Sequence, residues 1–102
     1  MFYRIYTVKL GTQANAKLAA AFFVEKFEHF VDMSKLAEVE VLLDAEGSVI
    51  VRVGCATLAD MKKFIRSGDA LMDELRQSFV CKSEKFSTIS VFRHAQLDHA
   101  AE

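Results

Sequence analysis

The chain has 102 residues, of which 52% are hydrophobic and 26% charged, and its formal net charge at pH 7 is -1. This balance excludes the strongly basic surface by which proteins bind nucleic-acid backbones. The longest nearly uncharged apolar run, Leu18 to Val24, is far shorter than the roughly 20 residues needed to cross a bilayer, so no membrane span is expected. Without Pro or Ser- and Gly-rich linkers, the sequence predicts one domain, residues 1–95, with a C-terminal tail, residues 96–102.

The N-terminus and the cysteines favour a cytoplasmic location. Met1 to Arg4 do not form the basic segment that precedes the apolar core of a signal peptide. Cys55 and Cys81 lie far apart in the sequence and lack the CxxC spacing of a metal or redox site. Two reduced thiols are the favoured interpretation, and a disulfide or redox pair is the alternative.

Six predicted elements follow one another along the chain. They are a strand (residues 2–10), a helix (14–33), two strands (39–43 and 49–53) around a turn (44–47), a helix (58–79) and a strand (86–93). This β-α-β-β-α-β order predicts an α+β ferredoxin-like sandwich. Its antiparallel sheet should carry both helices on one face.

The first predicted helix has an apolar stripe at helical spacing. The stripe consists of Ala20, Phe23, Val24, Phe27, Phe30 and Val31. Thr12 or Asn15 is the expected N-cap. On the opposite side, Glu25 and His29 lie one turn apart and could bind a metal, but a solvated polar face is favoured and no metal site is predicted.

The second predicted helix begins with a cap and contains an interruption. The hydroxyl of Thr57 is expected to accept a hydrogen bond from the backbone of Asp60. Gly68 is expected to break or kink the helix, with Asp69 as the N-cap of a restarted segment.

Alternation along the strands predicts one dry and one mixed face of the sheet. Val49, Val51 and Val53 should point toward the helices because side chains alternate with a period of two. The residues expected on the mixed face are Arg4, Tyr6, Glu38, Glu40, Arg52, Thr88, Ser90, Phe92 and His94. A slip of one residue in register would exchange the faces.

Two hypotheses account for the mixed face. It could be a dimer interface with Leu42, Ile50 and Phe92 as apolar anchors, which would also bury part of the abundant apolar surface. Alternatively, two such sheets could close around a cavity that binds a small organic molecule. Tyr6, Arg52 and His94 would line this cavity.

From Phe2 to His94 the pattern resembles the dimeric α+β barrel proteins, and in particular the antibiotic-biosynthesis-monooxygenase-like group. The resemblance rests on the element order, the length, the Phe-rich first helix and the predicted interruption of the second helix. It implies a homodimer with sheets packed face to face. Some members oxidise quinols or polyketide aromatics without metal or flavin, and others degrade haem. The haem-degrading members share an Asn, a Trp and a His; this chain has no Trp, and its sole Asn is Asn15 at the start of the first helix, which argues against that branch.

The resemblance therefore implies a cofactor-independent monooxygenase acting on a small aromatic or quinol-like molecule, with no cofactor expected. Such an enzyme must deprotonate a phenol and stabilise the anion. His94 is the candidate base, Arg52 or Arg4 the anion partner and Tyr6 a positioning donor. The residues expected to contact the ligand are Arg4, Ser90 and Phe92.

The competing hypothesis is a non-catalytic dimeric module that regulates or scaffolds. The two hypotheses differ in one structural feature, an enclosed cavity with His94 or Arg52 in its wall. The sequence does not decide whether the protein is an enzyme.

Overall fold

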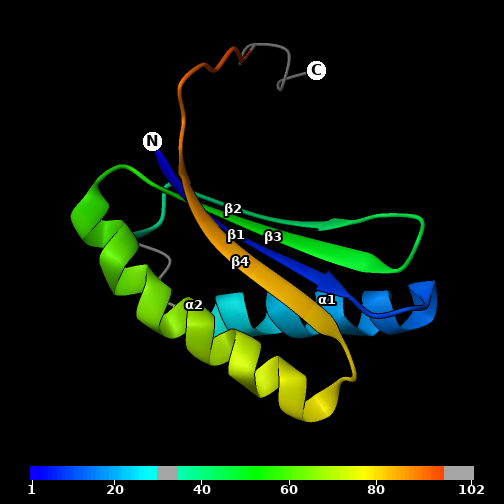
Figure 1. The fold of residues 1–102 in the computed structure, drawn as a ribbon. Helices are drawn as coiled ribbons and strands as arrows, with labels where there is room; N and C mark the ends of the chain where they lie inside the picture. The colour runs from blue at the N-terminus through cyan, green and yellow to red at the C-terminus, as the bar shows by residue number, and fades with distance from the viewer. Residues whose placement is uncertain (30–34, 96–102) are drawn as a thin grey trace.

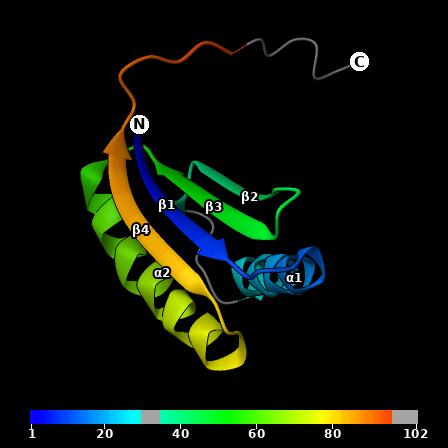
Figure 2. The same ribbon diagram turned by 45° about the vertical axis from the view of Figure 1, so that its right-hand side comes forward.

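The computed structural model describes residues 1–29 and 35–95 and shows a four-stranded antiparallel sheet covered on one face by two helices (Figures 1 and 2). The elements are β1 (Phe2–Lys9), α1 (Gln13–His29), β2 (Glu38–Leu43), β3 (Ser48–Cys55), α2 (Leu58–Ser78) and β4 (Lys82–Ile89). The strand order β2-β3-β1-β4 is that of a ferredoxin-like fold, which confirms the predicted fold class. The predicted helical residues 30–33 and the tail, residues 96–102, lie outside the described residues.

Side-chain caps begin both helices as the sequence predicts. The Thr12 hydroxyl accepts a hydrogen bond of 3.1 Å from the backbone N–H of Asn15. The Thr57 hydroxyl accepts one of the same length from the backbone N–H of Asp60. Each bond satisfies a backbone donor that the first helical turn leaves without an intrahelical partner.

The turn between β2 and β3 is held by one carboxylate. Asp44 Oδ1 accepts hydrogen bonds from the backbone N–H groups of Glu46 (2.9 Å) and Ser48 (2.8 Å). Gly47 has a φ of 91°, and a Cβ at this position would lie 2.8 Å from the backbone carbon of Thr12. Glycine is therefore required both by the backbone conformation and by the close approach of the loop that precedes α1.

The core lies between the sheet and the helices. Val49, Val51 and Val53 are each at most 1% exposed and face the helices, as predicted. They pack with Phe23 from α1 and with side chains of α2. The α2 side chains in this core are Met61, Phe64, Leu71, Met72 and Leu75.

The faces predicted for β1 were wrong. Tyr6 pairs with Val51 and Arg4 with Val53 across the β1–β3 ladder, and paired residues share a face, so Tyr6 and Arg4 point toward the helices. Tyr6 is 1% exposed. The physical reason is that Tyr6, Val8 and Leu10 share one face and are all buried in the core. Burying these three side chains stabilises the fold more than burying Ile5 of the opposite face would.

The predicted interruption of the second helix was also wrong. α2 runs unbroken from Leu58 to Ser78. A Cβ on Gly68 would lie 2.3 Å from the Tyr6 hydroxyl oxygen and 2.8 Å from the Phe64 ring. Glycine therefore serves close packing of α2 against the sheet, which offsets the roughly 1 kcal/mol that it costs within a helix.

The last strand lies earlier in the sequence than predicted. β4 spans Lys82–Ile89 rather than residues 86–93, because it pairs with β1 from Lys9↔Lys82 to Phe2↔Ile89. The chain beyond Ile89 passes the N-terminal end of β1, where Ser90 makes one further backbone hydrogen bond, to Met1. Ser90, Phe92 and His94 thus follow the strand in an extended arm that leaves the sheet (Figure 1).

Candidate functional site

A group of polar side chains converges on Asp69 between α2 and the sheet. Tyr6 from β1 donates its hydroxyl proton to Asp69 Oδ1 over 2.9 Å. Arg4, also from β1, lies 3.0 Å from the same oxygen, and Lys85 from β4 places its Nζ 3.0 Å from Asp69 Oδ2. These four residues, Arg4, Tyr6, Asp69 and Lys85, are called the Asp69 cluster below.

Arg4 is the most enclosed charge of the cluster. Its side chain is 11% exposed, compared with 28% for Asp69. One guanidinium nitrogen donates to Ser87 Oγ over 2.9 Å, and Cζ lies 5.5 Å from the centre of the Tyr6 ring. Arg4 Nε is buried and has no hydrogen-bond partner among the described residues. An unpaired buried donor costs about 1–3 kcal/mol, so this part of the cluster is not optimised for stability alone.

The cluster shifts the pKa values of its acidic members in opposite directions. Burial favours the protonated form of Asp69, but hydrogen bonds from Lys85, Arg4 and Tyr6 outweigh it and lower the pKa of Asp69. Burial raises the pKa of Tyr6; the hydrogen bond from Arg4 opposes this effect, whereas contact with the Asp69 carboxylate adds to it. At neutral pH Asp69 is therefore an anion and Tyr6 a neutral hydrogen-bond donor.

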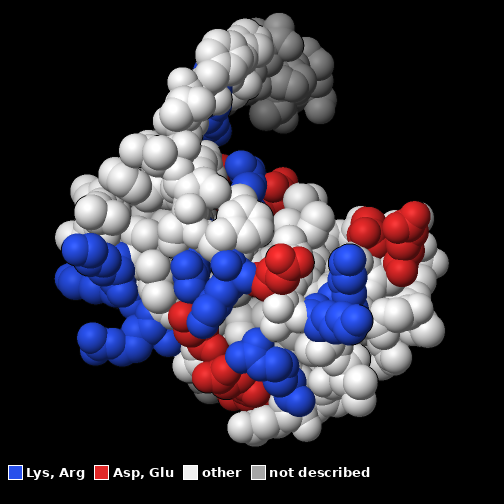
Figure 3. Space-filling view, in the orientation of Figure 1, with Lys and Arg blue, Asp and Glu red and all other residues white. Residues whose placement is uncertain are grey.

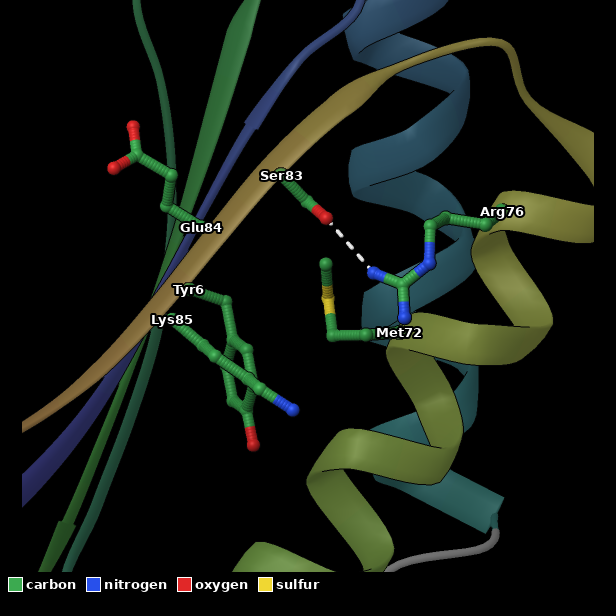
Figure 4. Close-up of a pocket in the computed structure, with 6 residues that line it drawn as sticks. All are labelled: Tyr6, Met72, Arg76, Ser83, Glu84 and Lys85. Atoms are coloured by element: carbon green, nitrogen blue, oxygen red, sulfur yellow. Dashed lines mark hydrogen bonds between the residues drawn. The ribbon is translucent and has the colours of Figure 1, made fainter.

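A small pocket of about 70 Å³ opens beside the cluster. Its lining residues are Tyr6, Met72, Arg76, Ser83, Glu84 and Lys85. Figure 4 shows the Lys85 amine and the Arg76 guanidinium pointing into the space between the sheet and α2, whereas the Glu84 carboxylate points to the other side of the sheet. Arg76 closes one side of the pocket by donating a hydrogen bond of 2.8 Å to Ser83 Oγ.

The structure does not bring the three predicted catalytic residues together. Tyr6 points into the core side of the sheet, and Arg52 lies on the opposite face, next to Ile5 of β1. His94 lies in the arm that follows β4 and is exposed. The sheet therefore separates Tyr6 from Arg52 within one chain, and the catalytic roles assigned to the three residues stay predictions.

Arg52 lies on the sheet face that neither helix covers, called the open face below. Its guanidinium lies 3.3 Å from Glu38 and 3.0 Å from Glu40, so two carboxylates of β2 balance its charge. Its Cζ lies 5.0 Å from the centre of the Tyr3 ring. Arg52 is thus engaged by neighbours within the chain.

The predicted ligand residues are divided between two places. Arg4 belongs to the Asp69 cluster, where it lies beside Tyr6. Ser90 and Phe92 lie in the arm; Phe92 is exposed, and the neighbouring Arg93 forms a 3.3 Å ion pair with Glu38. Arg4 and Tyr6 are therefore the two predicted residues that the structure unites.

Sequence reasoning missed Asp69 and Lys85 as site residues. Asp69 was interpreted as a helix cap because it follows Gly68, and Lys85 lies before the predicted start of the last strand. One signal was present: in an unbroken helix, Asp69 lies four residues after Ile65 and three before Met72, on the side that faces the sheet. An acidic residue on that side needs a polar partner, and Arg4 and Tyr6 were available.

Other classes of site find little support in the part of the chain that the structure describes. These residues contain no group of three or more His, Cys, Asp or Glu side chains that could hold a metal ion. Cys55 is buried, Cys81 is half-buried, and both are free thiols. Within residues 1–29 and 35–95, no helix has the length and apolarity required to cross a membrane.

Comparisons with known proteins relate the chain to others by fold. No protein-family model matches the sequence, and no curated protein matches it at a significant level. A protein from Deinococcus radiodurans, provisionally named an antibiotic biosynthesis monooxygenase, matches with a TM-score of 0.65 and 12% identity over 94% of this chain and 100% of that one. A similarly named protein from Chloroflexus aurantiacus matches with a TM-score of 0.61 and 15% identity over 93% of this chain and 98% of that one.

A dimeric ferredoxin-like protein from an uncultured marine organism matches with a TM-score of 0.63 and 12% identity, covering 94% of this chain and all of that one. At these identities the likeness concerns the fold. It confirms the predicted resemblance in architecture to the antibiotic-biosynthesis-monooxygenase-like proteins.

Proposed function

We propose that the protein is a homodimer of the dimeric α+β barrel type, in which each subunit binds a small organic molecule at the Asp69 cluster. The observation that carries the binding proposal is the convergence of Arg4, Tyr6 and Lys85 on one partly buried carboxylate beside a pocket. Removing charges from water is costly, and clusters of titratable groups with shifted pKa values are frequent at functional sites.

The open face supports the dimer. Its apolar side chains include Ile5, Leu42, Ile50 and Phe86, and the β1–β4 register places Phe86 opposite Ile5 near the middle of the sheet. Phe86 remains 45% exposed. Contiguous apolar surface on one sheet face is typical of an interface, and two such faces can pack around a twofold axis.

Phe86→Glu is expected to convert the dimer to a monomer without unfolding the domain. The new carboxylate would lie in the centre of the interface, so the dissociation constant should rise at least 100-fold. Sedimentation equilibrium measures this change. Val80→Glu is the control, because Val80 is 98% exposed between α2 and β4. A Phe86→Glu protein that remains fully dimeric would place the interface elsewhere.

The activity we propose for this site is cofactor-independent oxygenation of a quinol-like aromatic. A phenolic ligand at the mouth of the pocket would meet the Lys85 amine, whose positive charge stabilises a phenolate. The neutral Tyr6 hydroxyl is bonded to Asp69 and fixes the orientation of that carboxylate. Molecular oxygen is the co-reactant. With an anthrone, one oxygen atom becomes the carbonyl oxygen at the ring methylene, and the other leaves as water with the two hydrogens of that carbon. With a hydroquinone, one oxygen atom becomes the hydroxyl oxygen of a hydroxyquinone, and the other leaves as water with two of the quinol's hydrogens.

Oxygen uptake with a panel of quinols and anthrones tests this activity. Lys85→Gln is expected to lower the rate at least tenfold because it removes the positive charge that stabilises the phenolate. Lys82→Gln is the matched control, since Lys82 is an exposed lysine of the same strand and does not line this pocket. Uptake that is equal in both variants would assign the chemistry to another site, and no uptake with any substrate would remove the enzyme hypothesis.

One observation favours the second candidate, a non-catalytic dimeric module. The pocket measures about 70 Å³, whereas an engineered cavity of about 150 Å³ is known to bind benzene. An aromatic ring would therefore lie at the mouth of the pocket rather than inside it. A protein that binds a ligand with this pocket and shows no turnover would fit the module.

A further inference from the structure

We infer that the group entering the pocket is an oxyanion, the carboxylate of a small organic acid, held between Lys85, Arg76 and Ser83. This inference rests on the proposed function and names the class of ligand for the same site: an aromatic acid whose carboxylate enters the pocket while its phenol stays at the mouth, where the Lys85 amine reaches both. It follows from the charges that face the pocket, the donors that they leave available and the size of the pocket.

The charges that face the pocket are positive. Lys85 and Arg76 point into it, and Glu84, the sole acidic residue among those that line it, points to the other side of the sheet (Figure 4). The nearby carboxylates are already paired, Asp69 with Lys85 and Arg4, and Asp73 with Arg76. Figure 3 shows Lys and Arg side chains gathered on this side of the molecule, with Asp and Glu among them.

The side chains that line the pocket have more hydrogen-bond donors than they use in bonds to other residues. Lys85 has three N–H donors and gives one to Asp69, and Arg76 has five and bonds to Ser83 and Asp73. Ser83 Oγ accepts the Arg76 bond, which leaves its own hydroxyl proton to donate. Charged donors of this kind match a carboxylate, whose oxygens accept several hydrogen bonds at once.

The size of the pocket fits a carboxylate group better than a ring. The pocket volume of about 70 Å³ is roughly half that of an engineered cavity of about 150 Å³ that binds benzene, so a ring does not fit inside it. A carboxylate can enter beside Met72, which lines the pocket and is 2% exposed, while the rest of the ligand lies outside. Lys85 and Arg76 are both about half exposed, so we expect a weak, salt-sensitive site.

The test is an NMR titration of the full chain with benzoate and with benzamide, its neutral analogue. Benzoate is expected to shift the backbone amides of Met72, Arg76, Ser83 and Lys85 and to bind at least tenfold more tightly than benzamide. Arg76→Gln should weaken benzoate binding about tenfold, a loss of about 1.4 kcal/mol, because it removes a charged hydrogen-bond donor that is about half exposed. Ser83→Ala should weaken it less.

The control variant is Arg66→Gln, which makes the same change of charge at an exposed position of α2 that does not line the pocket. Equal weakening by Arg66→Gln would indicate diffuse attraction by the surface charge and would overturn the inference. Equal binding of benzoate and benzamide would overturn it as well.

A neutral quinol serves to separate the inference from the proposed function. If the quinol shifts the same amides and benzoate does not, the oxyanion inference fails while the proposed binding function stands. If none of the three molecules shifts these amides, the binding function at the Asp69 cluster fails together with the inference.

Discussion

Replacing Val51 by Asp is expected to unfold the domain. Val51 is 1% exposed, lies in the middle of β3 and faces the helices opposite Tyr6 and Val41. The carboxylate would enter a region lined by apolar side chains, and an unpaired charge there costs several kcal/mol. We expect a loss of about 4 kcal/mol or more, which is comparable to the entire stability of many small domains.

Urea unfolding followed by circular dichroism measures this loss. Val80→Asp is the matched control, because it makes the same chemical change at a residue that is 98% exposed. The control should change the free energy of unfolding by less than about 0.5 kcal/mol. A folded and stable Val51→Asp protein would show that β3 has the opposite face toward the helices.

Replacing Asp69 by Asn is expected to lower the free energy of unfolding by about 2 kcal/mol. The amide has nearly the same shape but no charge, so the enclosed Arg4 loses its anionic partner. Urea unfolding at pH 7 measures the change. Asp73→Asn is the control on the same helix: Asp73 is 70% exposed and paired with the exposed Arg76, and surface pairs of this kind contribute little. Equal effects of the two substitutions would mean that the Asp69 cluster stabilises no more than a surface pair.

The pH dependence of stability should change in the same variant. Because the folded protein lowers the pKa of Asp69, the unfolded chain binds its proton more readily. The stabilisation by Asp69 is therefore fully present above the unfolded pKa of about 3.9 and is lost as the pH falls through the lower folded value. Between pH 7 and pH 2, the free energy of unfolding of Asp69→Asn should therefore fall less than that of the natural protein, because the part that depends on protonation of Asp69 is absent. An unchanged pH profile would contradict the assigned direction of the pKa shift.

The candidate site could be predicted from the sequence only in part. Alternation in β1 predicts that Arg4 and Tyr6 share a face, and the structure shows this, but the predicted face is the one away from the helices, whereas both side chains point toward the helices. Their partner Asp69 comes from α2 and lies more than 60 positions later in the chain. Such a pairing depends on how the helix packs against the sheet, which local periodicity does not contain.

The placement of Arg52 and His94 shows the same limit. Both were assigned to one cavity with Tyr6, but a shift of one residue in β1 moves Tyr6 to the other face of the sheet. The position of His94 depended on the end of the last strand. The last strand ends at Ile89 because Ile89 pairs with Phe2, the first residue of β1. The residue types at positions 86–93 do not indicate this limit.

The sequence by itself determined the order of the elements, the helix caps at Thr12 and Thr57, the turn after Asp44 and the buried face of β3. Each of these depends on residues near one another in the chain: a hydroxyl three residues before an N–H, or apolar side chains at every second position. The tertiary structure alone decided that Gly68 accommodates Tyr6 within an unbroken helix and that Asp69 joins Arg4 and Lys85. The physical reason is that close packing and charge pairing are set by distances between elements, which arise only when the helices dock on the sheet.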